Sequence, residues 1–143
     1  MCNFISLIFV IKRILYQYEY ILWKHVLYPE SILIRNFIGK VSLKDIIDSW
    51  EYLHVNNLID NKVKGVINNL SGCELIMDME NFKTLIDYLK KQDYIKEIKL
   101  AVITDTPKTM IFPFLGEEQE RELKIKPFST MEAAVNWILM GLL

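Results

Sequence analysis

Histidine and cysteine are scarce in this chain of 143 residues, which holds two of each. Neither His25 nor His54 belongs to a set of side chains with the spacing of a zinc site. Cys2 and Cys73 stand far apart, whereas a secreted disulfide framework needs more cysteines at short spacings. We therefore expect no metal site, no disulfide, and two reduced thiols in a cytoplasmic protein.

A surplus of either charge is absent as well. The 17 basic and 18 acidic side chains leave a formal net charge of -1. Since no positive excess steers a polyanion to the chain, nucleic acid is not an expected partner. Five glycines and four prolines give neither a low-complexity linker nor an internal repeat, and the length suits one domain.

An apolar segment opens the chain. Its run over residues 4–11 is too short to span a bilayer, and Lys12 and Arg13 follow the run where a signal peptide has its charges before it. Three interpretations of residues 1–17 stay open: an extra helix packed on the domain, an interfacial amphipathic anchor, or residues upstream of the natural start. We expect membrane contact only through this segment, and we assign the domain to residues 18–143.

The first half of the domain reads as a hairpin, a helix and a buried strand. Residues 20–27 and 32–38 are rich in β-branched and aromatic side chains with turn-forming residues between them, which predicts an antiparallel hairpin. Ser42 and Asp45 form a capping box ahead of a helix with apolar side chains on one face. The apolar run that begins at Gly65 predicts a buried central strand.

The second half repeats strands and helices. Asp78 is expected to cap a second helix, and residues 98–103 form a second buried strand. A third helix is predicted to start at Thr106 and Pro107, residues 123–128 alternate as a half-buried edge strand, and a full capping box over residues 129–132 starts a final helix. The fold expected is α/β, with a mixed sheet of about five strands (an opening antiparallel hairpin, then β-α repeats) and helices packed on it.

Four motifs follow one another over most of the chain, from about residue 20 to residue 140. They are Tyr28-Pro29-Glu30 in the hairpin, Gly39-x-x-Ser42-x-x-Asp45 at the first helix, Asn69-Leu70-Ser71-Gly72 after the central strand, and Phe128-Ser129-Thr130-x-Glu132-Ala133-Ala134-x-x-Trp137 at the close. In this order the chain resembles small STAS-like proteins, and more narrowly their SpoIIAA-like (STAS/Sec14-type) branch. The resemblance implies a mixed sheet backed by helices.

The resemblance also implies a regulatory site, and here the chain departs from the pattern. STAS domains of the anti-sigma-factor-antagonist kind carry a phosphorylatable serine in an Asp-Ser-Ser-Gly segment that opens the second helix. The matching segment of this chain is Asp78-Met79-Glu80-Asn81, which contains no serine. Asp78 remains as a cap, and the resemblance therefore implies a binding module without the phosphorylation switch.

Polar residues follow both buried strands and are the first candidates for a site. Asn68, Asn69 and Ser71 come at the end of the central strand, and Thr104, Asp105 and Thr106 come at the end of its expected neighbour. In open α/β sheets the crevice beyond the carboxyl ends of the strands binds ligands. The alternative is that all of these residues only close turns and cap helices.

No catalytic set emerges from the sequence. Ser71 lacks the Gly-x-Ser-x-Gly elbow because Asn69 occupies the place of the first glycine. Most aromatic residues fall on faces assigned to the core, so we expect no aromatic cofactor box and no cofactor. Around Pro113, however, Phe112 and Phe114 belong to an apolar segment that cannot all face inward on a regular helix, and we expect a partner surface or a lid over an apolar ligand there.

These observations favour a non-catalytic, cytoplasmic, STAS-like binding or regulatory module for a protein partner or a small apolar ligand. Asn69, Ser71, Asp78, residues 104–106, Phe112 and Phe114 are its candidate binding residues. One alternative is a small enzyme that uses Asn69, Ser71 and Asp105. The other is a self-associating structural protein, joined through the edge strand or the N-terminal segment.

Overall fold

The computed structural model describes residues 31–105 and 122–140. The described strands are β1 (Ile32–Asn36), β2 (Gly39–Ser42), β3 (Gly65–Asn69), β4 (Cys73–Ile76), β5 (Lys99–Ile103) and β6 (Lys124–Phe128). The described helices are α2 (Leu43–Val55), α3 (Met79–Lys90), α4 (Asp93–Lys96) and α6 (Met131–Leu139). The expected α/β class is confirmed.

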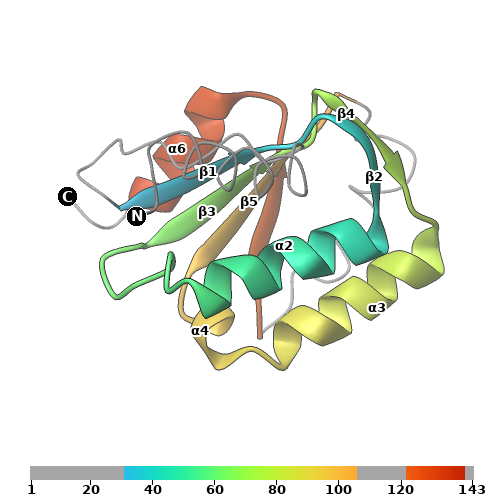
Figure 1. Cartoon of the computed structure of the whole chain (residues 1–143). Helices are drawn as coiled ribbons and strands as arrows, with labels where there is room; N and C mark the ends of the chain where they lie inside the picture. Colours follow the sequence, from blue (N-terminus) through green and yellow to red (C-terminus); the bar gives the residue numbers. More distant parts are fainter. Residues whose placement is uncertain (1–30, 106–121, 141–143) are drawn as a thin grey trace, which may run out of the picture.

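A four-stranded sheet of order β1-β3-β5-β6 forms the centre, and every neighbouring pair in it is parallel. Helices lie on both of its faces, with α2, α3 and α4 on one side and α6 on the other (Figure 1). Successive side chains of a strand point to opposite faces, so Leu33 and Val66 pack with α2 and α3 while Ile34 and Ile67 pack with α6. Both faces are therefore buried, as is usual for parallel strands.

One contact fixes how closely α6 approaches the sheet. A Cβ atom added at Gly65, the first residue of β3, would lie 2.6 Å from Cγ2 of Ile138 in α6. Only glycine leaves room for this side chain, which itself is fully buried. Gly65, which marks the start of the central strand in the sequence, is thus also the point at which α6 packs against the sheet.

The expected antiparallel opening hairpin is wrong for the strand that the structure describes. β1 pairs in parallel with β3, with Ile32 opposite Gly65 and Asn36 opposite Asn69. Its first four residues are buried, which suits a strand covered on both faces better than a strand of an exposed hairpin. The other expected hairpin strand, residues 20–27, lies outside the described residues, as do residues 1–17.

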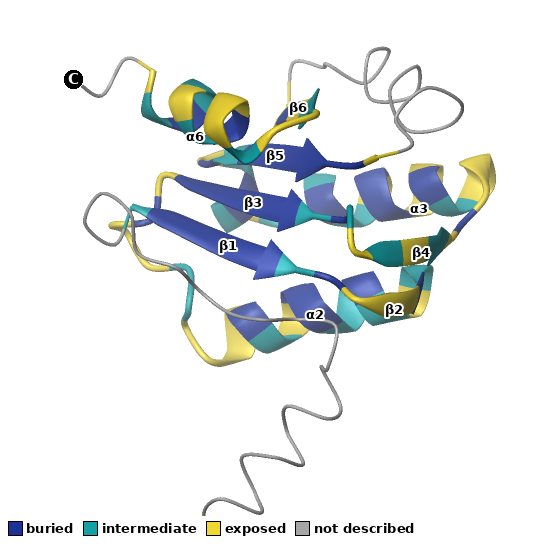
Figure 2. Ribbon diagram, turned by 90° about the horizontal axis from the view of Figure 1, so that it is seen from above, coloured by how far each residue is buried: buried dark blue, intermediate teal, exposed yellow. Residues whose placement is uncertain are grey.

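A second, two-stranded sheet extends beyond the carboxyl ends of the first, where the sequence predicts only strand ends and a loop. β2 follows β1, β4 follows β3, and the two pair in parallel (Figure 2). Gly39, at a φ of +78°, turns the chain into β2, a conformation that glycine adopts without strain. The described residues therefore form six strands in two sheets rather than about five strands in one.

Helix starts follow the sequence closely in two places and differ in a third. Ser42 with Asp45 and Asp78 with Asn81 both form reciprocal capping boxes, which confirms the predicted starts of α2 and α3. The final helix begins one residue later than predicted, because the side chain of Thr130 is the acceptor for the backbone N–H of Ala133. The predicted edge strand at residues 123–128 is confirmed as β6.

The predicted third helix starting at Thr106 and Pro107 lies outside the described residues. None of the helices in residues 31–105 and 122–140 is long and apolar enough to cross a membrane. The longest, α2, has 13 residues, whereas a bilayer needs about 20.

Candidate functional site

The polar residues predicted at the strand ends form a small network that closes a turn. Nδ2 of Asn69 donates to Oδ1 of Asn36 at 2.8 Å across the β1-β3 pair. Oδ1 of Asn69 accepts from the backbone N–H of Ser71 at 3.1 Å and from its hydroxyl at 2.6 Å. This is the side-chain arrangement of an Asx turn. The structure thus brings Asn69 and Ser71 together, but the hydrogen bonds between them close the turn.

The other predicted site residues do not join this network in the described structure. Thr104 is buried at the end of β5, and Asp105 beside it is exposed. Oδ1 of Asp78 accepts from the backbone N–H of Asn81 at 2.8 Å, so this carboxylate caps α3. The three remaining predicted site residues, Thr106, Phe112 and Phe114, lie outside the described residues.

A buried polar cluster of Arg35, Asn68 and Ser49 lies under α2, and of its members only Asn68 was among the strand-end residues predicted from the sequence. The guanidinium of Arg35 is held at the sheet, and the residue is only 1% exposed. Its Nε and Nη2 donate to Oδ1 of Asn68 at 2.9 and 2.5 Å, and its Nη1 donates to the hydroxyl of Ser49 at 2.8 Å. The hydroxyl of Ser49 in turn donates a hydrogen bond to the carbonyl of Ile46 at 2.6 Å. β1, β3 and α2 each contribute one member of the cluster.

Aromatic rings cover both faces of this cation. Cζ of Arg35 lies 4.1 Å from the centroid of the Trp50 ring and 5.0 Å from that of Phe37. Arginine is less strongly hydrated than lysine and its flat group stacks on aromatic rings, so this is a favourable way to bury a positive charge. The charge remains, in a region from which water is largely excluded.

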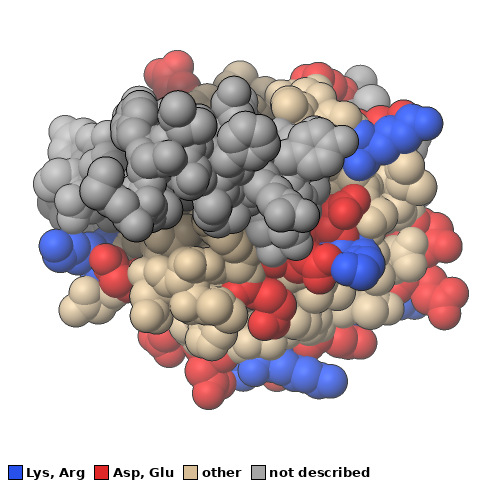
Figure 3. All heavy atoms as spheres, viewed as in Figure 1, with Lys and Arg blue, Asp and Glu red and all other residues tan. Residues whose placement is uncertain are grey.

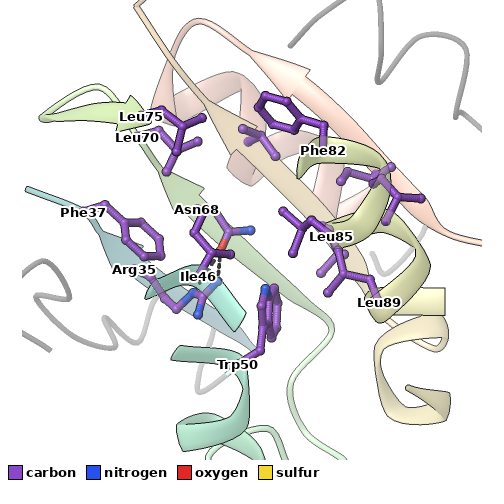
Figure 4. Close-up of a pocket in the computed structure, with 14 residues that line it drawn as sticks. Arg35, Phe37, Ile46, Trp50, Asn68, Leu70, Leu75, Phe82, Leu85 and Leu89 are labelled. Carbon is purple, nitrogen blue, oxygen red and sulfur yellow. Dashed lines mark hydrogen bonds between the residues drawn. The ribbon is translucent and has the colours of Figure 1, made fainter. Parts of the chain in front are cut away.

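A cavity adjoins the cluster between the sheet and helices α2 and α3. Its volume is about 50 Å³, and Arg35 and Asn68 are polar residues in its lining. Figure 4 shows both of them on the side of the sheet, with Leu85 and Leu89 of α3 facing them. Val102 of β5 contributes to the apolar wall. The surface of this cavity is almost entirely apolar, and the buried Arg35–Asn68 pair lies beside it.

A local signal for this cluster exists in the sequence. Arg35 stands inside the apolar run of residues 32–37, and the period of two places it on the same face as Leu33 and Phe37, both buried in the core. A lone arginine at a core position of a strand is rare unless its charge is held by partners. The identity of those partners depends on the β1-β3 register, which the sequence alone does not supply.

Two tyrosines lie near the outer side of the cluster. The hydroxyl of Tyr88 donates to the carboxylate of Glu51, and burial together with this carboxylate raises the pKa of Tyr88 above its ordinary value. Burial first, and then the Glu51 charge, raise the pKa of Tyr94 to about 12, against an opposing effect of Arg35. The Tyr94 hydroxyl is buried without a hydrogen-bond partner among the described residues, while its ring stacks on His54 at 4.9 Å.

Nothing in the described structure assembles a nucleophile with a base. Burial raises the pKa of the Cys73 thiol to about 11, and this thiol donates to the carbonyl of Leu70 at 3.3 Å. It is therefore protonated at neutral pH and a poor nucleophile. His54 is exposed in the last turn of α2. The described residues contain no group of three or more His, Cys, Asp or Glu side chains that could hold a metal ion.

Charged side chains are interspersed over the visible face that carries α2 and α3, and no patch of one sign dominates its described part (Figure 3). On the other side of the sheet, an open groove of about 440 Å³ is lined by Lys99, Lys124, Lys126 and Trp137. Nζ of Lys99 donates to the carbonyls of Trp137 and Met140 at 2.8 and 3.2 Å, so this lysine caps the end of α6.

No model of a known protein family matches the chain, and no curated protein or solved structure matches it either.

Proposed function

We propose that this chain is a non-catalytic, cytoplasmic, STAS-like binding module that holds a small apolar ligand in the cavity between its sheet and α3. The cavity is the observation that carries the proposal. Protein interiors are close-packed, and an apolar void forfeits contacts that a better-filled core would keep. A ligand that restores these contacts binds the folded state only and stabilises it.

The size of the cavity limits the ligand. A volume of about 50 Å³ has room for roughly four groups the size of water or methyl. An apolar lining keeps water out unless polar partners are at hand, and the surface of this cavity is almost entirely apolar. A short aliphatic molecule fits this chamber, whereas a lipid chain or a nucleotide does not.

The STAS-like part of the proposal rests on the motifs and their positions. Asp78 caps α3, the second helix of the predicted repeat, where the resembling proteins carry their serine segment. The described strands are all parallel, so the mixed sheet that the resemblance implies adds no support here. The missing serines favour a module that binds a ligand over one that is switched by phosphorylation.

Native mass spectrometry of the protein purified from its own cells tests the proposal, because a carried ligand adds a small mass that is lost on denaturation. Val102→Ile, which adds a methyl group to the cavity wall, is expected to reduce the fraction of ligand-bound protein at least tenfold. Val66→Ile is the matched control, since Val66 is equally part of the core but is not in the cavity lining. A bare protein in all three samples would contradict the proposal.

A protein partner is a second candidate, favoured by exposed apolar side chains around the β2-β4 sheet. Ile38, Ile76 and Met79 are 44%, 51% and 40% exposed. Large apolar side chains that gather on a surface often mark an interaction site. Ile76→Ser is expected to weaken a pulldown of that partner without changing the unfolding midpoint, and the segment with Phe112 and Phe114 is tested in the same way.

The two remaining alternatives have simple tests. An enzyme that used Asn69, Ser71 and Asp105 would lose its activity in an Asp105→Ala variant, and a screen in which this variant retained all activity would remove that alternative. Self-association through the edge strand β6 would raise the molecular mass measured by light scattering as the protein concentration increases.

A further inference from the structure

β6 is the edge strand of the four-stranded sheet, since no described strand pairs with its outer side (Figure 2). Consecutive residues of this strand and its approach, 123–126, line the open groove of about 440 Å³. The side chains of Leu123 and Ile125 are buried in the core beneath α2 and α3. These two residues therefore reach the groove with their backbone, so the groove exposes the edge of the strand.

Pro127 indicates which backbone groups of β6 point outward. It lies opposite Val102 of β5, and a proline within a sheet stands where its missing N–H would point away from the neighbouring strand. The backbone groups of successive residues point alternately to the two sides of a strand, so those of Leu123 and Ile125 point the same way as those of Pro127. The outer edge therefore presents the N–H and C=O groups of Leu123 and Ile125, and Pro127 limits further pairing because it has no N–H.

Lysines give the same edge a positive charge. Lys124 and Lys126 are exposed and point to the face of the sheet that α6 covers. Lys99 of β5 lies directly opposite Lys124, and like charges in such a pair are destabilising. Nζ of Lys99 is bonded to the carbonyls at the end of α6, whereas the described lining of the groove holds no carboxylate for Lys124 and Lys126. An anionic partner would supply it.

We propose that the outer edge of β6 binds an extended acidic segment of a partner protein as an added strand. The backbone of this segment bonds to Leu123 and Ile125, and its carboxylates face Lys124 and Lys126. A second copy of the chain is disfavoured as the occupant, because two β6 strands side by side would bring lysines against lysines. The inference goes beyond the proposed function, because the partner lies at the edge of the sheet and the cavity lies beneath α2 and α3.

A heptapeptide of alternating glutamate and valine, blocked at both ends, tests the inference, because an extended strand places its carboxylates on one face. Two matched peptides separate charge from strand pairing. In the first, glutamine replaces every glutamate, and the second keeps the glutamates but carries backbone N-methyl groups on two adjacent central residues, which blocks both of its edges. Each is titrated into the full chain while the backbone amide NMR signals of Leu123 and Ile125 are followed.

We expect the glutamate peptide to shift both amide signals and to bind about tenfold more tightly than either matched peptide at low salt. In about 0.5 M salt its advantage over the glutamine peptide should shrink, since exposed charges are screened. The double variant Lys124→Gln/Lys126→Gln removes the charge and leaves the backbone in place, so it should weaken the glutamate peptide alone. Lys83→Gln/Lys91→Gln is the matched control, because these exposed lysines of α3 and its C-terminal cap change the net charge equally away from the groove.

Several outcomes would overturn the inference. Equal binding of the glutamate peptide and its N-methylated form would show attraction without an added strand, and equal binding of the glutamate and glutamine peptides would show that the lysines do not select the partner. The same loss in both double variants would mean a response to net charge alone. Shifts confined to the β2-β4 sheet, or no shift with any peptide, would also contradict it. The peptide ratios in the wild type decide the question even if a variant does not fold.

Discussion

Asn68 and Asn69 are adjacent in β3 and do different things. Asn68 faces α2, where its amide oxygen accepts two hydrogen bonds from the buried Arg35 beside the cavity. Asn69 ends the strand and ties Asn36 to the turn at Ser71. An asparagine therefore holds a buried charge at position 68 and closes a turn at position 69. The two side chains have different surroundings because successive side chains of a strand point to opposite faces of the sheet.

The comparison shows why a polar residue at a strand end is a weak guide to function. Sequence reasoning favoured Asn69, because it belongs to the loop that follows the strand. The structure gives the chemically distinctive surroundings to Asn68, whose cross-strand neighbour is Arg35. Burial of a charge is costly and must be compensated in detail, whereas a turn can be closed by many residues.

The largest expected difference is between Asn68→Ala and Asn69→Ala. Asn68→Ala deprives a buried guanidinium of two hydrogen bonds and should lower the free energy of unfolding by about 3 kcal/mol. Asn69→Ala removes hydrogen bonds at a partly exposed turn and should cost about 1 kcal/mol. Urea unfolding of both variants measures the difference. Equal losses in the free energy of unfolding would show that the buried cluster contributes no more to stability than the turn.

Substitution of one serine in the buried cluster and one in the turn tests the same difference, with smaller expected losses of stability. Ser49 is fully buried and accepts from Arg35, so Ser49→Ala should cost about 1.5 kcal/mol. Ser71 donates to Asn69 in the turn, and Ser71→Ala should cost about 0.5 kcal/mol. A larger loss for Ser71→Ala than for Ser49→Ala in the same unfolding experiment would reverse the ranking of the two regions.

Removal of the Tyr94 hydroxyl, next to the buried cluster, should raise the stability of the fold rather than lower it. Tyr94→Phe removes a buried hydroxyl that has no hydrogen-bond partner among the described residues, so we expect stability to rise by about 0.5 kcal/mol. Tyr88→Phe is the control, because it loses the bond to Glu51 and should be slightly less stable. A clear loss of stability in Tyr94→Phe would mean that its hydroxyl has a partner, such as an ordered water.

Alkaline pH should weaken the fold through two partly buried groups, Cys73 and Tyr94. The pKa of Cys73 is raised from its ordinary 9.0 to about 11, so the folded state holds this proton more tightly than the unfolded chain. The resulting stability is present in full below pH 9 and is lost as the pH rises toward 11. Tyr94 acts in the same sense between pH 10 and 12. Thermal melts should show a smaller fall above pH 9 in Cys73→Ser, and an unchanged fall would contradict the assignment.

Local patterns predicted much of this fold. The caps at Ser42 and Asp78 and the apolar runs of β3 and β5 depend on neighbours in the sequence, and they lie where the sequence placed them. Pairing is not local, and nothing in residues 32–38 states that β1 lies parallel to β3. The second sheet was missed for the same reason, because β2 and β4 exist only through each other.

The candidate site was harder to predict than the fold. Arg35 was visible as a lone charge in an apolar run, but its partners Asn68 and Ser49 lie 33 and 14 residues away. A cavity is a property of side-chain packing between β5, α2 and α3, and no short stretch of sequence encodes it. The residues that the sequence did select, Asn69 and Ser71, were correctly placed at a strand end but serve the turn.

A crystal structure of the full chain under xenon pressure tests the proposed ligand site most directly, because xenon enters apolar cavities of this kind. We expect a single strong anomalous peak between α3 and the sheet, beside Leu85 and Val102, and its loss in the Val102→Ile variant. Ordered water filling this chamber, or no xenon peak there in the wild type, would contradict the claim that the chain carries an apolar ligand site.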